Sequence, residues 1–205
     1  MTKKPLFITF EGIDGAGKST QISKLCDYLK KNGIEFILTR EPGGCEIAEK
    51  IREIILSTKS DLGAAGELLL YLAARAEHIR QVIKPALDCG KWVICDRFAD
   101  STFAYQGAGR GLNVKKMKEI NSFAAQNISP DLTVLLDISV DVSLERRKSR
   151  GKSADRLEQN DRIFFEKVRG YFIKLSRDES GRFLVIDATL SESEIHKKII
   201  DRINL

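Results

Sequence analysis

The fold is decided by one stretch near the N-terminus, Gly12-Ile13-Asp14-Gly15-Ala16-Gly17-Lys18-Ser19, which matches the pattern GxxxxGK[ST] at every fixed position. An apolar run that predicts a strand, Leu6 to Phe10, precedes it, and a helical pattern begins at Lys18. Glycines at such a turn let backbone N–H groups converge on phosphate oxygens, and the helix N-terminus adds positive potential. In this pattern the lysine reaches the β- and γ-phosphates and the Ser19 hydroxyl binds Mg²⁺. The stretch therefore predicts a phosphate-binding loop (P-loop) for ATP or GTP.

Outward from the P-loop, short apolar runs alternate with stretches of helical period. This alternation predicts an α/β protein in which a five-stranded parallel sheet is flanked by helices. The predicted strands are Leu6 to Phe10, Glu35 to Thr39, Trp92 to Cys95, Leu132 to Asp137 and Phe183 to Asp187. The predicted helices are Lys18 to Asn32, Glu46 to Leu56, one or two over Ala65 to Leu87, Val114 to Gln126, Val140 to Ser149, Leu157 to Ser176 and Glu192 to Ile203.

Composition narrows the class of protein. The chain has 205 residues, is 42% apolar and 31% charged, and shows no repeat or linker, so we expect one domain over residues 1–205. The longest apolar run, Leu68 to Ala74, is far shorter than the roughly 20 residues that span a bilayer. Four cysteines without a CxxC pair argue against a structural zinc site. With no signal-peptide pattern after Met1, we expect a cytoplasmic protein that contacts no membrane.

The net charge of +5 comes from one short segment. Between Arg146 and Arg156 six basic residues accompany one acidic residue, so the rest of the chain is neutral overall. Such a segment is too short to follow a nucleic-acid backbone, so we expect no nucleic-acid partner. A solvated helix end is the simplest interpretation. The alternative is a lid, over about residues 146–158, that closes over a transferring phosphoryl group and excludes water.

Arginines in three other segments favour the lid. Arg40 follows the second predicted strand, Arg97 follows the third with Asp96 before it, and Arg75 shares a helix face with Tyr71. The carboxyl ends of parallel strands are where α/β proteins bind ligands. A phosphate monoester is already ionised near neutral pH, so an enzyme that phosphorylates it must overcome repulsion between two anions. Arginine, with its planar fork of donors, suits that task, and the pattern favours a kinase with a phosphate acceptor.

Two other functions fit parts of the sequence. A deoxynucleoside kinase with a hydroxyl acceptor would use Asp14 or Glu11 as a general base and would need fewer arginines. A P-loop module that binds nucleic acid, or has a regulatory role, would use the basic segment, but that segment has no aromatic side chains on which bases could stack. Both remain as alternatives to the phosphate-acceptor kinase.

Six motifs make the chain resemble the thymidylate kinase (dTMP kinase) family from Phe7 to about Leu175. They are Phe-Glu-Gly-Ile-Asp-Gly-Ala-Gly-Lys-Ser-Thr (10–20), Thr-Arg-Glu-Pro-Gly-Gly (39–44), Leu-Ala-Ala-Arg-Ala-Glu-His (72–78), Asp-Arg-Phe (96–98), Ser-Thr-Phe-Ala-Tyr-Gln-Gly (101–107) and Arg-Gly-Lys-Ser-Ala-Asp-Arg-Leu-Glu (150–158). The resemblance implies the nucleoside monophosphate kinase fold, phosphorylation of dTMP to dTDP by MgATP in dTTP synthesis, and a homodimer. Gly15 stands where one branch of the family has an arginine, so the lid would supply the catalytic cation, as in bacterial-type members.

The resemblance also implies the roles of individual residues. Catalysis would involve Lys18, Asp96, Arg97 and Arg150, with Arg156 as the second choice for the lid arginine. ATP would be bound by Gly12, Asp14, Gly15, Ala16, Gly17, Lys18, Ser19, Thr20 and Arg146, and Mg²⁺ would be held by Ser19 and, through water, by Asp96. The acceptor dTMP would contact Asp14, Arg40, Pro42, Tyr71, Arg75, Arg97, Thr102, Tyr105 and Gln106. Among these, Tyr71 would stack on thymine, Arg75 would bond its carbonyl, and Tyr105 would disfavour ribonucleotides.

Overall fold

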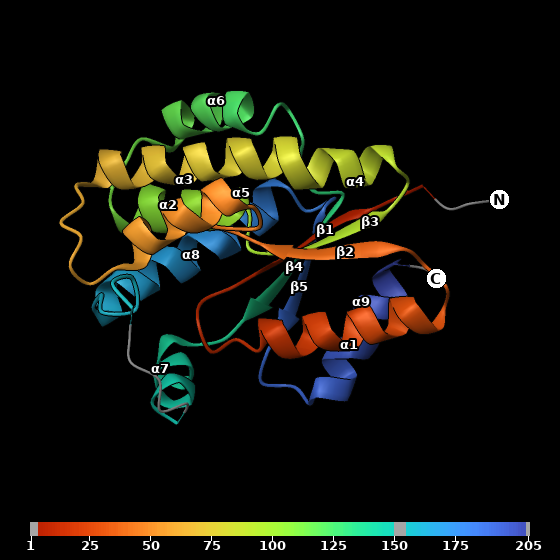
Figure 1. The fold of residues 1–205 in the computed structure, drawn as a ribbon. Coiled ribbons are helices and arrows are strands. Elements are labelled where there is room, and N and C mark those ends of the chain that lie inside the picture. The colour runs from red at the N-terminus through yellow and green to blue at the C-terminus, as the bar shows by residue number, and fades with distance from the viewer. Residues whose placement is uncertain (1–3, 150–154, 204–205) are drawn as a thin grey trace.

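Five parallel strands form one sheet in the computed structural model, which describes residues 4–149 and 155–203 (Figure 1). The strand order is β2-β3-β1-β4-β5, and every pair of neighbours is parallel. The strands are β1 (Phe7–Glu11), β2 (Phe36–Arg40), β3 (Trp92–Asp96), β4 (Leu132–Asp137) and β5 (Phe183–Asp187). The predicted five-stranded parallel sheet is therefore confirmed, with β1, β2 and β3 each ending one residue later than expected.

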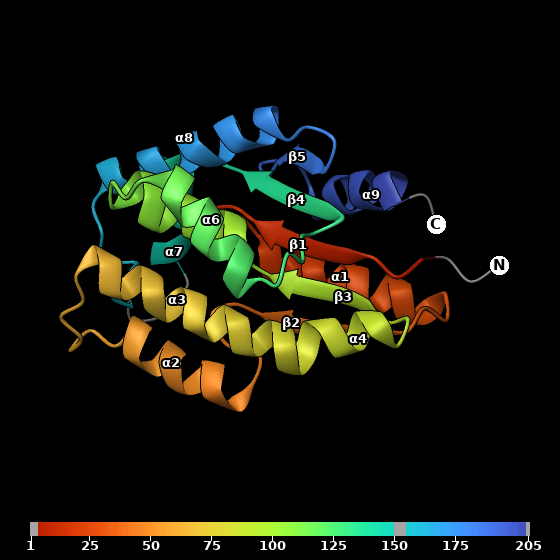
Figure 2. The ribbon, with the colours of Figure 1, turned by 90° about the horizontal axis from the view of Figure 1, so that it is seen from above.

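Helices cover both faces of the sheet (Figures 1 and 2). Helices α1 and α9 pack on one face, and α3, α4, α6 and α8 lie over the other. Their bounds are α1 (Lys18–Lys31), α2 (Glu46–Leu56), α3 (Ala64–His78), α4 (Lys84–Asp88), α5 (Ala99–Thr102), α6 (Val114–Ala124), α7 (Val140–Lys148), α8 (Arg162–Asp178) and α9 (Glu192–Ile203), with π-helical turns η1 (Ile79–Ile83) and η2 (Phe103–Gly109).

The side-chain alternation of β1 explains why both faces are covered. Ile8 and Phe10 point to one face and pack in a core cluster with Leu25 of α1. Phe7 points to the other face and packs in a second cluster with Leu72 of α3. Since successive side chains of a strand point to opposite faces, a run that is apolar at nearly every position needs helices on both. All five residues of β1 are buried.

Two segments differ from the sequence-based expectation. The helix expected from Leu157 begins only at Arg162, because the side chain of Asp161 accepts a hydrogen bond from the backbone N–H of Phe164 and caps α8. The second segment, α5 with η2, follows Arg97 and was not predicted as helical. Its sequence is rich in small and aromatic residues and lacks a clear helical stripe of apolar side chains.

Within the described ranges, none of the helices combines the length and the apolar character needed to cross a bilayer.

Candidate active site

The P-loop joins β1 to α1 through glycines at positive φ. Gly12, Gly15 and Gly17 have φ angles of +130°, +86° and +91°, a region that favours glycine. A Cβ at Gly12 would lie 2.3 Å from the backbone oxygen of Leu136 in β4, so a larger residue does not fit there. The Nζ of Lys18 folds back over the loop and donates to the carbonyl of Gly12 at 3.0 Å. Burial, followed by the nearby positive charge of Arg97, lowers the pKa of Lys18.

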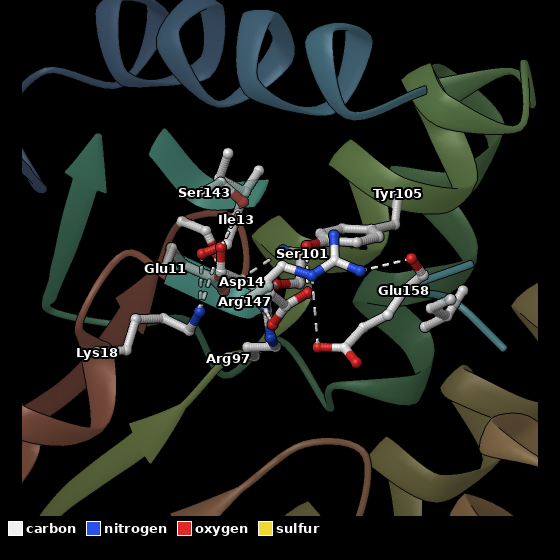
Figure 3. Close-up of polar contacts among 12 residues, drawn as sticks. Glu11, Ile13, Asp14, Lys18, Arg97, Ser101, Tyr105, Ser143, Arg147 and Glu158 are labelled. Carbon is white, nitrogen blue, oxygen red and sulfur yellow. Dashed lines mark hydrogen bonds and ion pairs between the residues drawn. The ribbon is translucent and has the colours of Figure 1, made fainter. Parts of the chain in front are cut away.

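A cluster of charges lies beside the P-loop at the carboxyl edge of the sheet (Figure 3). Arg97 donates to Asp14 Oδ1 at 2.7 Å and to Ser101 Oγ at 3.1 Å, and its guanidinium lies 5.2 Å from the ring centre of Tyr105. Burial opposes ionisation of Asp14, but Arg97 and Lys18 outweigh it, so the pKa of Asp14 lies below its ordinary value. Asp14 is therefore an anion, and Arg97 is held in place by it.

Glu11 fixes the turn that presents Arg97. Its carboxylate accepts hydrogen bonds from the backbone N–H of Phe98 at 2.8 Å and from the hydroxyl of Ser101 at 2.5 Å (Figure 3). Arg97 itself has a φ of +68°, which is uncommon for a residue with a side chain. Burial and the neighbouring Asp100 raise the pKa of Glu11 to about 7, against the opposing effect of Arg97. Both oxygens of Glu11 are thus bonded to the turn, so Glu11 holds the segment that carries Arg97.

One cavity runs from the P-loop across the sheet edge to α3. Most of the residues that the sequence assigned to the site line it: Asp14, Gly15, Gly17, Lys18, Ser19, Arg40, Pro42, Tyr71, Arg75, Asp96, Arg97, Thr102, Tyr105 and Gln106. Four others do not line it: Gly12 and Ala16 are buried in the P-loop, Thr20 is exposed in α1, and Arg146 donates to the carbonyls of Gly15 and Ala188. Residues that the sequence analysis missed also line it: Glu41, Arg52, Leu56, Phe98, Ser101, Asp155 and Leu157.

The wall of the cavity beside α3 is a buried network of polar side chains around Arg75. Its guanidinium donates to Glu41 Oε2 at 2.8 Å, to Thr102 Oγ1 at 2.9 Å and to Asn121 Oδ1 at 2.7 Å, and its side chain is 1% exposed. The other oxygen of Glu41 lies 3.1 Å from Nδ1 of His78, which is fully buried. A buried arginine needs such partners, because an unpaired charge in the interior is costly. Glu41 and His78 lie inside two of the quoted motifs, and that position was the feature of the sequence that could have identified them as site residues.

Two further arginines, Arg40 at the end of β2 and Arg52 of α2, line another wall of the cavity. Both oxygens of Glu49 accept from Nη2 of Arg40, at 2.9 and 2.8 Å, in a pair that is about half exposed. Arg52, one turn along α2 from Glu49, donates to the carbonyl of Pro42 at 2.7 Å. Burial and the positive charge of Arg40 lower the pKa of Arg52. Arg52 was missed because a lone arginine inside a helical pattern is ordinarily a solvent-facing residue.

The residues at the P-loop end fit a magnesium ion bound together with phosphates. Asp96 Oδ1 is buried and has no hydrogen-bond partner among the described residues, while Ser19 is exposed in the first turn of α1 on the same cavity. No group of three or more His, Cys, Asp or Glu side chains able to hold a metal occurs in the part of the chain that the structure describes. Mg²⁺ commonly takes only one or two protein ligands and completes its octahedron with phosphate oxygens and water.

Residues at the two ends of the segment expected to form a lid, 146–158, are bonded to the rest of the site. The hydroxyl of Ser143 in α7 donates to the carbonyl of Asp14 at 2.6 Å, and Arg146 donates to the carbonyl of Gly15 at 3.3 Å. At the other end, Arg156 donates to Glu67 Oε2 at 2.5 Å, so the second choice for the lid arginine is bonded to α3 instead of the P-loop. Arg150, the first choice, lies outside the described residues.

A P-loop on a parallel sheet of this strand order, in a cavity whose other walls carry arginines, defines a P-loop nucleoside monophosphate kinase. The family model described as thymidylate kinase matches residues 10–199. The chain belongs to this family, and the resemblance, fold and kinase class predicted from the sequence are confirmed.

Similar proteins support the assignment along nearly the whole chain. A thymidylate kinase of Magnetococcus marinus is 50% identical over 89% of this chain and 87% of its own. One of Chlorobaculum tepidum is 46% identical over 97% of each chain. Among solved structures, a thymidylate kinase from Ehrlichia chaffeensis superposes with a TM-score of 0.78 at 34% identity, covering 98% of this chain and 99% of that one.

Proposed function

We propose that this protein transfers the γ-phosphoryl group of ATP to dTMP and forms dTDP, a step in dTTP synthesis. The observation that carries the proposal is a cavity that the P-loop shares with a buried arginine, Arg75, and with the Tyr71 ring. A nucleoside monophosphate would place its base against this wall and its phosphate toward Arg97 and the P-loop. Family membership supports the choice of thymine as the base.

On the donor side, the P-loop backbone and Lys18 bind the ATP phosphates. The residues proposed for this task are Gly12, Asp14, Gly15, Ala16, Gly17, Lys18, Ser19 and Thr20, with Arg146 lying against adenine. Mg²⁺, when bound with ATP, neutralises phosphate charge and would be held by Ser19 directly and by Asp96 through water. The Lys18 ammonium, which now bonds the loop carbonyl of Gly12, would exchange that contact for a phosphate oxygen.

On the acceptor side, side chains from separate segments each contact a different part of the nucleotide. Arg40 and Arg97, with the Pro42 loop, bind the acceptor phosphate. Tyr71, whose side chain lines the cavity, stacks on the base. The remaining proposed contacts are Asp14 to the 3′-hydroxyl, Arg75 to the thymine carbonyl, Thr102 and Gln106 along the base, and Tyr105 near the 2′-position.

Phosphoryl transfer to a phosphate acceptor requires alignment and positive charge from the protein, and it does not require a general base. The acceptor phosphate, with a second pKa of about 6, presents an anionic oxygen at neutral pH. Lys18 and Arg97 then lower the repulsion between donor and acceptor and stabilise charge on the transferring group. Asp14 serves this arrangement by holding Arg97 at 2.7 Å, within reach of both nucleotides.

The remaining proposals concern the architecture. Residues 1–205 form one kinase domain, with a lid over about 146–158 in which Arg150 contacts the transferring phosphoryl group. The protein acts in the cytoplasm, without nucleic acid or membrane as a partner. It forms a homodimer, and exposed apolar side chains on neighbouring helices, Leu69 of α3 and Ile120 and Phe123 of α6, are available for that contact.

A coupled assay of ADP formation with different acceptors tests the function. We expect turnover with dTMP, less with dUMP, and little with dCMP, dAMP or thymidine. Equal or faster turnover with thymidine would favour the hydroxyl-acceptor kinase and overturn the proposal. ATP binding without dTMP-stimulated ADP formation, together with strongly salt-dependent DNA binding, would favour the nucleic-acid-binding module instead.

A further inference from the structure

Glu67 of α3 lies directly behind the wall of the acceptor pocket, and it is fully buried. Its Oε1 accepts a hydrogen bond from Nε2 of Gln106 at 2.7 Å, and its Oε2 accepts from Nη2 of Arg156 at 2.5 Å. The guanidinium of Arg110 lies 3.6 Å from the same oxygen. Two arginines thus supply the positive charge that a buried carboxylate requires. An ionised carboxylate can accept hydrogen bonds but cannot donate them.

This one-way chemistry fixes the orientation of the Gln106 side chain. An amide has a donor nitrogen at one end and an acceptor oxygen at the other, and Glu67 takes the nitrogen. Gln106 is itself buried and lines the cavity, so Oε1 is the atom of its amide that is left for a bound base. We infer that Glu67 is a positioning residue for base recognition, which turns Oε1 of Gln106 toward the pocket and thereby selects pyrimidines that carry N3–H. The inference rests on the proposed function.

The two classes of pyrimidine differ at this ring position. Thymine and uracil carry a hydrogen on N3 and donate to an acceptor, whereas N3 of cytosine is itself an acceptor. Cytosine would place two acceptors face to face in a buried site and leave both without a hydrogen bond, which is unfavourable. A carboxylate that fixes the amide therefore discriminates between dTMP and dCMP, and leaves the choice between dTMP and dUMP unaffected.

The same carboxylate also anchors the lid, and the experiment has to separate these two effects. Arg156 donates from Nε to the carbonyl of Ile55 in α2 as well as to Glu67, so it fastens the stem of the lid to the acceptor wall. Arg156→Gln loosens this anchor but keeps the Glu67 carboxylate as the partner of Gln106, with Arg110 still beside it. Glu67→Gln loosens the anchor and, in addition, allows Gln106 to reverse, because the new amide can donate.

The test compares kcat/KM for dTMP, dUMP and dCMP in the wild type and its variants. In Glu67→Gln we expect the preference for dTMP over dCMP to fall about tenfold, mainly through KM, with the dTMP to dUMP ratio unchanged. Glu77→Gln, the same change on α3 at a surface ion pair, serves as the matched control and should keep the preference. Exchange of the two groups in Glu67→Gln/Gln106→Glu places an acceptor toward the pocket again and should restore it.

The contrary outcomes are distinct. An unchanged preference in Glu67→Gln, or an equal loss with all three acceptors, would show that Glu67 only stabilises the fold. A loss of preference in Arg156→Gln as large as in Glu67→Gln would show that the lid anchor sets it, and would also overturn the inference. Should Glu67→Gln not fold, Gln106→Met removes the same acceptor without altering α3, and an unchanged preference there would refute it. Failure of the wild type to phosphorylate dTMP would instead refute the proposed function.

Discussion

The donor and acceptor halves of the cavity are built in different ways. The donor half is a backbone loop in which glycines at positive φ leave room for phosphates, and the Lys18 side chain folds over this loop. The acceptor half is a side-chain structure in which Arg75, Glu41 and their partners are bonded to one another in the interior. The donor half binds phosphates mainly through backbone N–H groups. The acceptor half binds its nucleotide through charged side chains, which can be buried only when they are paired. Damage to the donor half should therefore reduce rate, whereas damage to the acceptor half should reduce rate and stability together.

The largest expected effect is that of Lys18→Met, which tests the donor half. We expect kcat to fall about 10³-fold or more, because an aligned cation is lost from the transferring group. Since burial lowers the pKa of Lys18, its removal relieves a desolvated charge, and Tm should stay the same or rise. Steady-state kinetics and calorimetry measure the two effects, with Lys31→Met at the exposed end of α1 as control. A large fall in Tm would break the comparison.

Arg150→Ala tests the lid. We expect kcat to fall about 10²-fold with little change in the KM for dTMP, as for a group that acts mainly in the transition state. A pure rise in that KM would show that the lid arginine binds substrate instead.

Arg75→Ala tests the acceptor half. The change leaves the buried carboxylate of Glu41 without its strong partner, so we expect a loss of about 3 kcal/mol in the free energy of unfolding. The KM for dTMP should rise about tenfold or more while that for ATP stays constant, measured at a temperature where the variant is folded. Weaker ATP binding with an unchanged KM for dTMP would show that Arg75 acts in the donor half and would contradict its assignment to the acceptor half.

The pH dependence of stability sharpens the comparison at the boundary between the halves. The pKa of Glu11 rises from 4.5 in the unfolded chain to about 7 in the fold, so the folded state binds the proton more tightly. Between these values the contribution of Glu11 to stability must fall as pH rises, by about 1–3 kcal/mol in total. Urea unfolding from pH 5 to 8 should show this slope in the wild type and a flatter curve in Glu11→Gln. Identical slopes would contradict the assignment.

The smallest effect is expected at Arg40, whose pair with Glu49 is half exposed. Arg40→Gln should change stability by less than about 1 kcal/mol, because solvent screens such pairs. It should raise the KM for dTMP through the lost phosphate contact, and the rise should shrink in high salt. A destabilisation as large as that of Arg75→Ala would remove the distinction between exposed and buried arginines.

The same contrast explains what could be predicted from the sequence. The donor half lies in consecutive residues, so the pattern from Gly12 to Ser19 identified it directly. The acceptor half is assembled from β2, α2, α3, β3 and η2, and the residues that were found there lie inside a recognised motif or, like Tyr71, directly beside one. Arg52 and Glu67 lie in helical patterns where an exposed position is the ordinary expectation, and only the packing of α2 and α3 against the cavity shows otherwise. The late start of α8 was missed because the cap at Asp161 competes with an apolar pattern that begins earlier.

Arg97 has a consequence for anyone who engineers this enzyme. Its backbone lies at φ +68°, where a side chain costs about 1–3 kcal/mol and glycine costs nothing. Arg97→Gly would remove that cost but would also leave the carboxylate of Asp14 without its closest cation, so the two effects on stability oppose each other. A library screened only for survival at high temperature would therefore not register the loss of activity in such a variant. Selection on this scaffold has to reward turnover in every round.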